Sequence, residues 1–349
     1  MYEVSPNKNN EFSRTSGSSN EYFLEKVVNL SCPTKGYVMN RQIQFIFNPS
    51  ELGAGTRGAS LGPEAIRAAA RTQNATLFSE FPVYTLPNRN DLLDRPTNFP
   101  FAKRIDGVVQ IFEAVKQQVK EAIDSSMFPF IIAGDHSSAG GTMAGLKMAY
   151  PGKRLGVVWI DAHADIHSPY TTPSGNIHGM PIATALGVDQ SDLQKNNLDL
   201  TTMQYWNQLK SHSLKPADLI YIGVRDVEEE EIHAMKELNL RNYTVRELRE
   251  KGVQVCMDEI KEKMQSCDIV YVSFDVDSMD PSETSYGTGT PVPEGITFEE
   301  AKSILTSLTK LDQLACLEIV EVNPCLDNEK NKMAERSFEL IDSLVKSLK

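Results

Sequence analysis

Cysteine is scarce in this chain of 349 residues, and its distribution argues against a disulfide framework. The five cysteines form an odd set without any Cys-x-x-Cys spacing. Such a pattern is typical of reduced thiols in the cytosol rather than of a secreted scaffold. Cys325 stands beside candidate site residues, and we interpret it as a small buried residue. The five are Cys32, Cys256, Cys267, Cys316 and Cys325.

Long apolar runs are also missing. No uninterrupted apolar stretch approaches the roughly 18 residues that would indicate a membrane span. Residues 1–20 are rich in Ser, Asn, Glu and Lys and contain no apolar core of a secretory signal. We therefore expect a soluble, cytoplasmic protein in which residues 1–40 form a mobile N-terminal tail.

The chain has no surplus of positive charge. Its 35 Lys and Arg residues stand against 47 Asp and Glu residues, which gives a formal net charge of −12. This balance disfavours nucleic acid or an anionic membrane as a partner. It is compatible with a cationic small-molecule substrate.

The sequence does contain apolar, β-prone runs that alternate with stretches of helical periodicity, such as Ile105–Ile123. This alternation is typical of right-handed βαβ units. We therefore expect residues 41–349 to form a single α/β domain with three layers (αβα) and a mainly parallel central sheet. The predicted strands are Gln42–Phe47, Phe128–Ala133, Leu155–Ile160, Leu219–Gly223, Ile269–Phe274 and Leu314–Val320. The other predicted helices are one that starts near Gly62, Gly140–Met148, Glu228–Leu238, Cys256–Met264, Phe298–Leu308 and Lys330–Leu348.

A glycine-rich loop, Leu52–Gly58, follows the first predicted strand. It lacks both the Gly-x-Gly-x-x-Gly pattern and the Gly-Lys-Ser/Thr ending of phosphate-binding loops. We interpret it as a flexible connection to the helix that begins around Pro63, because proline favours the first helical position.

Three short segments behind predicted strands carry the most informative residues: Gly134–Ser137, Asp161–Asp165 and Ser273–Asp277. Ligands bind at the carboxyl ends of parallel strands. If Asp-x-His-x-Asp is extended, its three polar side chains share one face. Four aspartates packed together would resist ionising unless cations neutralised them. A carboxylate-rich set without thiolates favours a hard divalent ion such as Mn²⁺ over structural zinc.

These segments resemble the arginase (ureohydrolase) family, and the similarity runs from about Phe45 to the C-terminus. It rests on Trp159–Ile166, Thr171–Gly179, Ser273–Asp280 and Glu321–Pro324, which keep the family's order. The resemblance implies an arginase-like αβα fold. It also implies a manganese-dependent enzyme that hydrolyses L-arginine to L-ornithine and urea through a metal-bridging hydroxide. Co²⁺ is an alternative cofactor, since it accepts the same oxygen and nitrogen ligands.

The resemblance further implies two metal ions per chain. The first ion would be bound by His136 and Asp165 together with two bridging aspartates. The second would be bound by His163 and Asp277 together with the same pair. The bridging aspartates are Asp161 and Asp275.

Catalytic roles are implied for three residues. Asp165 would pass a proton to the leaving amine. His178 would shuttle protons with solvent, a task that suits an imidazole with a pKa near 6.5. Glu321 would bind the substrate guanidinium by charge-assisted hydrogen bonds and hold its carbon in place.

Substrate recognition is assigned to two further regions. Ser174 and Asn176 would bind the α-carboxylate, and His167, Glu228 and Thr290 would complete the substrate site. His167 stands where arginases usually have Asn, and Glu228 stands where they usually have Asp.

Two other hypotheses stay open. Agmatinase or another guanidino-acid hydrolase would share the metal residues and differ in the loops. A non-catalytic family member is disfavoured, because all the expected ligands are present together with His178 and Glu321. The family also implies a homo-oligomer, either a trimer or a hexamer.

Overall fold

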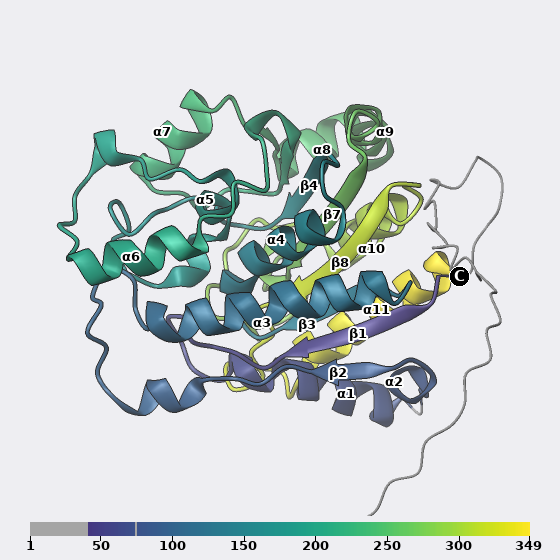
Figure 1. Cartoon of the computed structure of the whole chain (residues 1–349). Coiled ribbons are helices and arrows are strands. Elements are labelled where there is room, and N and C mark those ends of the chain that lie inside the picture. The colour runs from purple at the N-terminus through teal and green to yellow at the C-terminus, as the bar shows by residue number, and fades with distance from the viewer. Residues whose placement is uncertain (1–40, 74) are drawn as a thin grey trace, which may run out of the picture. The chain divides into compact units, whose positions relative to one another are not determined.

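The computed structural model describes residues 41–73 and 75–349, which are built around one eight-stranded sheet (Figure 1). The predicted tail, residues 1–40, and Cys32 lie outside the described residues. All paired strands are parallel, in the order β2-β1-β3-β8-β7-β4-β5-β6. The strands are β1 (Ile43–Asn48), β2 (Val83–Thr85), β3 (Phe128–Ala133), β4 (Leu155–Ile160), β5 (Leu219–Ile222), β6 (Arg241–Tyr243), β7 (Ile269–Asp275) and β8 (Leu314–Val320).

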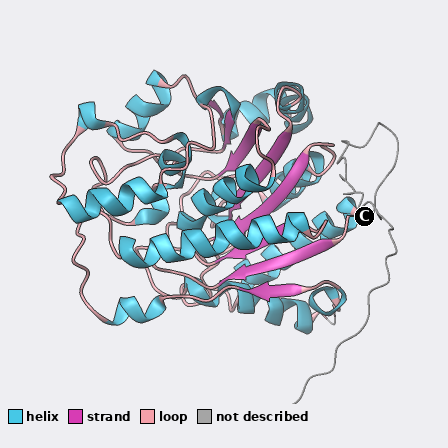
Figure 2. Cartoon of the chain, viewed as in Figure 1, coloured by secondary structure: helices cyan, strands magenta, loops and turns pink. Residues whose placement is uncertain are grey.

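Helices cover both faces of this sheet (Figure 2). One face carries α1 (Gly62–Thr72), α2 (Leu77–Glu80), α8 (Val245–Lys251), α9 (Val253–Met264), α10 (Phe298–Leu308) and α11 (Lys332–Leu348). The other face carries α3 (Ile105–Asp124), α4 (Ala139–Ala149), α5 (Pro181–Leu186), α6 (Leu200–Leu209) and α7 (Glu229–Glu237). The predicted three-layer fold is confirmed, and the sheet is entirely rather than mainly parallel.

The central strands β3, β4, β7 and β8 are buried at every residue. Parallel strands that are covered on both faces consist of nearly continuous apolar runs. The central strands could therefore be predicted well from the sequence. The strands β2 and β6 have three residues each and no apolar run, and the sequence analysis missed them. It also missed the helices α2, α5, α6 and α8.

Local sequence signals set the helix ends. At the start of α10, the Thr297 hydroxyl accepts from the Glu300 backbone N–H at 3.1 Å, and the Glu300 carboxylate accepts from the Thr297 N–H at 2.8 Å. This reciprocal pair satisfies two donors that the first turn leaves free. The helix then buries Phe298, Ile304 and Leu308 against the sheet, each worth roughly 1.5–3 kcal/mol.

The glycine-rich loop Leu52–Gly58 is packed against the carboxyl ends of the strands, contrary to its interpretation as a flexible connection. The Gly53 N–H donates to Asp135 at 2.9 Å. A Cβ at Gly53 would lie only 2.6 Å from the Ser137 Cβ. Glycine at position 53 is therefore required by close approach to the His136 segment.

Among the described residues, no helix has both the length and the apolar character that crossing a bilayer requires.

Candidate metal centre and substrate cleft

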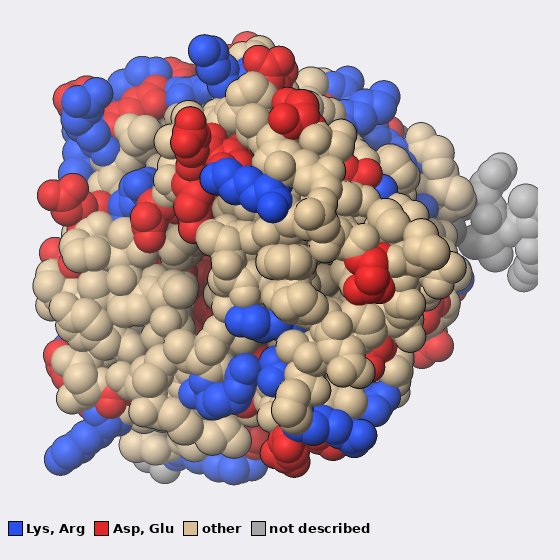
Figure 3. All heavy atoms as spheres, turned by 90° about the vertical axis from the view of Figure 1, so that its left-hand side faces the viewer, with Lys and Arg blue, Asp and Glu red and all other residues tan. Residues whose placement is uncertain are grey.

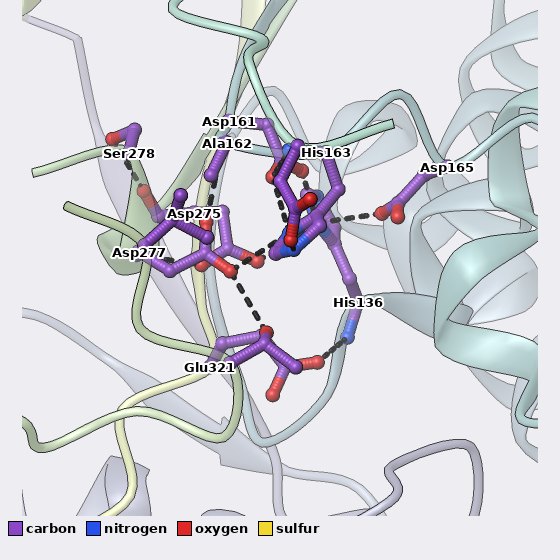
Figure 4. Close-up of polar contacts among 12 residues, drawn as sticks. His136, Asp161, Ala162, His163, Asp165, Asp275, Asp277, Ser278 and Glu321 are labelled. Atoms are coloured by element: carbon purple, nitrogen blue, oxygen red, sulfur yellow. Dashed lines mark hydrogen bonds and ion pairs between the residues drawn. The ribbon is translucent and has the colours of Figure 1, made fainter. Parts of the chain in front are cut away.

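Four neighbouring strands deliver acidic and imidazole side chains to one edge of the sheet. His136 follows β3, Asp161 follows β4, Asp275 ends β7 and Glu321 follows β8. These side chains converge in Figure 4. Figure 3 views this side of the molecule and shows a narrow hollow with acidic side chains inside it.

The first candidate cation position lies beside His136. Its Nδ1 is 3.1 Å from an oxygen of Asp161 and 3.2 Å from one oxygen each of Asp165 and Asp275. All four side chains are buried. Nδ1 nevertheless has no hydrogen-bond partner in the described part of the chain. A cation bound among the three carboxylates would be a partner for the lone pair of this ring nitrogen.

Three contacts fix the orientation of His136. The Trp159 ring stacks on the imidazole, with centroids 4.0 Å apart and planes inclined by 7°. The imidazole Nε2 lies 2.7 Å from the Ser273 hydroxyl. The His136 backbone N–H donates to Glu321 Oε1 at 3.0 Å.

The second candidate position is formed by Asp161, His163 and Asp277, whose ligand atoms lie within 4.8 Å of one another. His163 Nδ1 is 3.1 Å from Asp277 Oδ2 and 3.5 Å from Asp161 Oδ1. The other oxygen of Asp161 faces His136. Asp161 therefore belongs to both groups.

Turns rather than strand alternation bring the Asp-x-His-x-Asp residues together. The strand β4 ends at Ile160, so the expectation that Asp161, His163 and Asp165 share one face of a strand is wrong. The His163 backbone N–H donates to Asp161 at 2.8 Å, which closes the first turn. Asp165 has a φ of +51°, in the left-handed region, and this turns its carboxylate back toward His136.

The carboxylates repel one another in this buried site. Burial, followed by the charge of Asp161, raises the pKa of Asp165 to about 6. Burial, followed by the charge of Asp277, raises the pKa of Asp275 well above its ordinary value. Burial would also raise the pKa of Asp161, but the neighbouring imidazoles of His136 and His163 lower it.

Cations would relieve this repulsion. The donor set consists of carboxylate oxygens and imidazole nitrogens without thiolates, which suits a hard or borderline divalent ion. These residues therefore fit two divalent cations.

Glu321 connects the first group to His178. Its Oε1 lies 3.2 Å from His178 Nδ1 and also accepts from the His136 backbone. Burial would lower the pKa of His178, but the hydrogen bond and charge of Glu321 outweigh it and raise that pKa to about 9. The His178 side chain is 19% exposed, so it lies between the buried carboxylate and solvent.

The loop that carries His178 is held by residues 100–103. Ser174 is exposed and Asn176 is half-buried. Gly175 between them has a φ of +74°, and a Cβ there would collide with the Pro100 carbonyl oxygen. The Lys103 N–H donates to the Gly175 carbonyl at 2.8 Å. The loop therefore depends on glycine at this position.

His167 and Glu228 contact each other at the start of α7. His167 Nε2 lies 3.2 Å from Glu228 Oε2, and its Nδ1 lies 3.0 Å from the Thr171 hydroxyl. The hydrogen bond with His167 lowers the pKa of Glu228 to about 2. Burial, followed by the hydrogen bond and charge of Glu228, raises the pKa of Glu231 to about 9.

Two predicted positions differ from expectation in their surroundings. The Thr290 hydroxyl donates to Asp277 at 3.0 Å, so in this structure it supports a candidate metal ligand. Cys325 is exposed, and its interpretation as a buried residue is wrong. It follows Pro324 beyond the end of β8, where the chain has returned to the surface.

The sequence analysis assigned no role to four residues that shape the site. Trp159 donates to Asp161 at 2.9 Å, and Ser273 contacts His136. Each of the two stands two positions before an aspartate of the site, a spacing that could have drawn attention to them. Asp226, 3.6 Å from His163, and Thr171 gave no local signal.

Known proteins are similar to this chain in both sequence and fold. The Arginase family matches residues 41–346. The arginase of Bacillus subtilis is 34% identical over 310 residues, which cover 88% of this chain and 98% of that protein. The crystal structure of Bacillus subtilis arginase superposes with a TM-score of 0.73 at 32% identity, covering 87% of this chain and 98% of that one. The crystal structure of Entamoeba histolytica arginase in complex with L-ornithine gives 0.76 at 27% identity, covering 88% and 99%. This chain therefore belongs to the arginase family.

Proposed function

We propose that this protein hydrolyses L-arginine to L-ornithine and urea. The observation that carries the proposal is the position of Glu321 against His136, which belongs to one of two groups of cation ligands that share Asp161. The relatives at 30–34% identity carry the name arginase. The Entamoeba histolytica relative was solved with L-ornithine, the amino-acid product of the proposed reaction.

We assign the cations to the ligand set predicted from the sequence. His136 and Asp165 would hold one ion, His163 and Asp277 would hold the other, and Asp161 and Asp275 would be shared. When bound, two divalent cations would supply Lewis acidity and a water of lowered pKa. Mn²⁺ is the proposed ion, with Co²⁺ as the alternative.

Glu321 is assigned to the guanidinium group. One of its oxygens is already engaged by His136 and His178. In the described part of the chain, Oε2 of Glu321 has no hydrogen-bond partner, so it remains able to accept from a guanidinium N–H. Such a charge-assisted bond would orient the substrate carbon toward the carboxylate groups.

Two residues are assigned to proton transfer. Hydrolysis breaks the bond between the guanidinium carbon and the side-chain nitrogen, and that nitrogen must leave protonated. The Asp165 carboxylate is the group proposed to pass the proton. His178, between Glu321 and solvent, is proposed to shuttle protons between the site and solvent.

The amino-acid head group is assigned to the cleft rim. Ser174 and Asn176 would bind the α-carboxylate, and Glu228 would bind the α-ammonium group. In the free protein Glu228 already contacts His167, so the substrate would have to compete with or share this contact. A site that hydrogen-bonds a substrate group rejects analogues that lack it.

Urea release from L-arginine, agmatine and 4-guanidinobutyrate, measured side by side with added Mn²⁺, tests the proposal. The expected kcat/KM for L-arginine exceeds that for agmatine by at least roughly 10²-fold, because agmatine lacks the α-carboxylate. Comparable efficiency on agmatine would contradict the arginase assignment. Urea release from none of the three would contradict catalysis itself.

The variant Asp161→Asn tests the metal assignment. It keeps the size of the shared side chain but removes its charge, so metal analysis should find fewer than two ions per chain and urea release should collapse. Full occupancy with wild-type turnover would contradict the shared role of Asp161.

We further propose a homo-oligomer, either a trimer or a hexamer, in the cytoplasm. Sedimentation velocity tests the assembly, and fractionation of the source cells tests the location. A monomer at micromolar concentration would contradict the first proposal.

A further inference from the structure

Arg225 follows β5 and connects separate segments at the carboxyl ends of the strands. It is half-buried, and the proposed chemistry does not use it. A guanidinium group carries five N–H donors in a rigid, planar arrangement. In Arg225 all five donate to backbone carbonyl oxygens. The side chain is therefore a rigid cross-link between backbone segments rather than a solvated surface charge.

Two strand ends supply three of the acceptors. Nη2 of Arg225 donates to the Asp277 carbonyl at 3.0 Å, and Nη1 donates to the Ser278 carbonyl at 3.3 Å. Nη1 also donates to the Gly223 carbonyl at 3.1 Å. Asp277 and Ser278 lie on the segment that follows β7 (Figure 4). One guanidinium group therefore joins the end of β5 to the segment that carries a candidate ligand of the second cation.

The other two bonds hold the segment Thr290–Pro293. Nη2 donates to the Val292 carbonyl at 2.7 Å, and Nε donates to the Pro293 carbonyl at 2.9 Å. Pro291 and Pro293 have no backbone N–H, so this segment has few donors of its own. Within the described part of the chain, Arg225 is the only residue that makes hydrogen bonds to the backbone of this segment.

Thr290 connects this segment back to Asp277. The Thr290 hydroxyl donates to Asp277 Oδ2 at 3.0 Å. The same oxygen lies 3.1 Å from His163 Nδ1. The other oxygen, Oδ1, accepts from the Ala162 N–H at 3.2 Å. Arg225 therefore holds both the backbone of Asp277 and the segment whose hydroxyl contacts the Asp277 carboxylate.

The backbone of Arg225 contacts the remaining ligands of the same position. Its N–H donates to the Ala162 carbonyl at 2.8 Å. Ala162 stands between Asp161 and His163, which together with Asp277 form the second candidate cation position. All the segments that supply this position are thus attached to Arg225.

We propose that Arg225 is a positioning residue that holds Asp277 and the segment Thr290–Pro293 in place for the second cation. The proposal rests on the proposed function in taking Asp277 and His163 as ligands of that cation. The first position should not depend on Arg225, since among the described residues its side chain donates to no residue of the His136 segment. Residues that orient metal ligands commonly change metal affinity about 10–100-fold.

Two variants isolate this role. Arg225→Lys keeps the positive charge, but an ammonium group has three donors and no planar fork, so it cannot make all five bonds. Thr290→Val removes the hydroxyl that contacts Asp277 and leaves the guanidinium group unchanged.

Arg41→Lys is the matched control. The Arg41 guanidinium also cross-links backbone segments, because it donates to the carbonyls of Leu311, Asp312 and Leu314. Leu314 begins β8, so these contacts lie at the opposite edge of the sheet from the candidate cation positions. Arg41→Lys therefore removes bonds of the same kind without touching a candidate ligand.

The measurement is calorimetric titration of the metal-free, full-length protein with Mn²⁺, with thermal unfolding recorded for each variant. Arg225→Lys and Thr290→Val should weaken one of the two ions about 10-fold or more and leave the other within about 3-fold. Arg41→Lys should lower the unfolding temperature and stay within about 3-fold of wild type for both ions.

His163→Asn identifies the affected ion, because it removes a proposed ligand of the second position alone. Adding Arg225→Lys to His163→Asn should leave the affinity of the remaining ion within about 3-fold of that in His163→Asn. A further 10-fold loss in the double variant would show that Arg225 acts on the first position and would overturn the proposal.

Wild-type affinity for both ions in folded Arg225→Lys, or in Thr290→Val, would also overturn the proposal. An equal loss at both ions, or the same loss in Arg41→Lys, would overturn it as well, since the effect would then come from general destabilisation. If the wild-type protein binds fewer than two ions, the failure lies in the metal assignment of the proposed function. Thr290→Val removes a single hydroxyl, so it decides the question even if Arg225→Lys does not fold.

Discussion

His136 shows how single contacts prepare the site at the residue scale. Its ring is stacked on Trp159, its Nε2 contacts Ser273, and its Nδ1 faces three carboxylates. One face and both nitrogens of the imidazole therefore have separate contacts. The ring has little freedom to turn away from a bound cation.

His178 is the residue for which proton transfer is tested most simply. His178→Asn should lower kcat about 10²–10⁴-fold, the range typical of general acid–base residues, with both ions still bound. Stopped assays of urea release and metal analysis on the same preparation check this. His233→Asn is the control, because His233 is a partly exposed histidine that is paired with Asp192 and has no assigned role in the proposed chemistry. Loss of metal from His178→Asn would instead identify His178 as a ligand.

The buried carboxyl group of Glu231 should make the stability of the protein depend on pH. Its pKa is raised from 4.5 to about 9, first by burial and then by Glu228. The folded protein therefore keeps a proton that the unfolded chain releases above pH 4.5, and this residue makes stability fall as pH rises between these values. Glu231→Gln removes the titration. The free energy of unfolding of the variant should therefore rise relative to that of wild type as pH increases from about 5 to about 8.

The neighbouring acid Glu230 is the control of opposite sign. The hydrogen bond from Lys195 lowers its pKa, so its contribution to stability is present at neutral pH and is lost as pH falls. Glu230→Gln should therefore lose stability at neutral pH and approach wild type in acid. Denaturant unfolding at several pH values, with metal loading held constant, separates the two cases. A difference between Glu231→Gln and wild type that does not change with pH would contradict the assigned titration.

Single residues of the site were predictable where a motif carried them. His136, Asp161, His163 and Asp275 stand in short segments behind apolar runs, and the structure brings them together. Their supporting residues were not predictable in the same way. Ser273 contacts His136 across 137 positions of sequence, and no local pattern encodes such a pair.

At the scale of elements, the loop Thr171–His178 depends on its contact with residues 100–103. Gly175→Ala would add a Cβ at a φ of +74° and against the Pro100 carbonyl oxygen. The left-handed backbone alone costs roughly 1–2 kcal/mol for a residue with a Cβ, and the collision adds to it. The displaced loop should raise KM for L-arginine by more than it lowers kcat.

Gly152→Ala is the matched control for Gly175→Ala. Gly152 has a φ of +77°, and a Cβ there would meet nothing within 4 Å. It should show the backbone cost in thermal unfolding and keep wild-type KM. Equal kinetic effects of the two substitutions would show that the Pro100 contact does not position the loop.

Elements were predictable in proportion to their burial. The strand β3 and the helix α10 were predicted with the bounds that the structure has, because each has a clear apolar pattern. The strand β2 gave no such pattern, since only one of its three residues is even partly buried. The turn at Asp165 was predicted as extended because its left-handed backbone depends on packing by later segments.

At the scale of the whole molecule, strand order creates the site. The last two strands in sequence, β7 and β8, insert between β3 and β4. Segments from four separate parts of the chain therefore end side by side. The alternation of strands and helices predicted parallel layers, but it contained no information about this insertion, which depends on contacts between distant residues.

The negative net charge of the chain agrees with an acidic site at the carboxyl ends of the strands. The formal net charge is −12, and acidic side chains lie within the hollow at the carboxyl ends of the strands (Figure 3). Such a field would attract both divalent cations and a guanidinium substrate.

We propose that hydrolysis of L-arginine by this protein requires two cations that share Asp161. Titration of metal-free protein with Mn²⁺, with bound ions and urea release followed in the same samples, tests it most directly. Urea release should rise to its plateau only as occupancy passes from one ion to two ions per chain. Full activity at one ion or at none, or two bound ions without urea release, would contradict the claim.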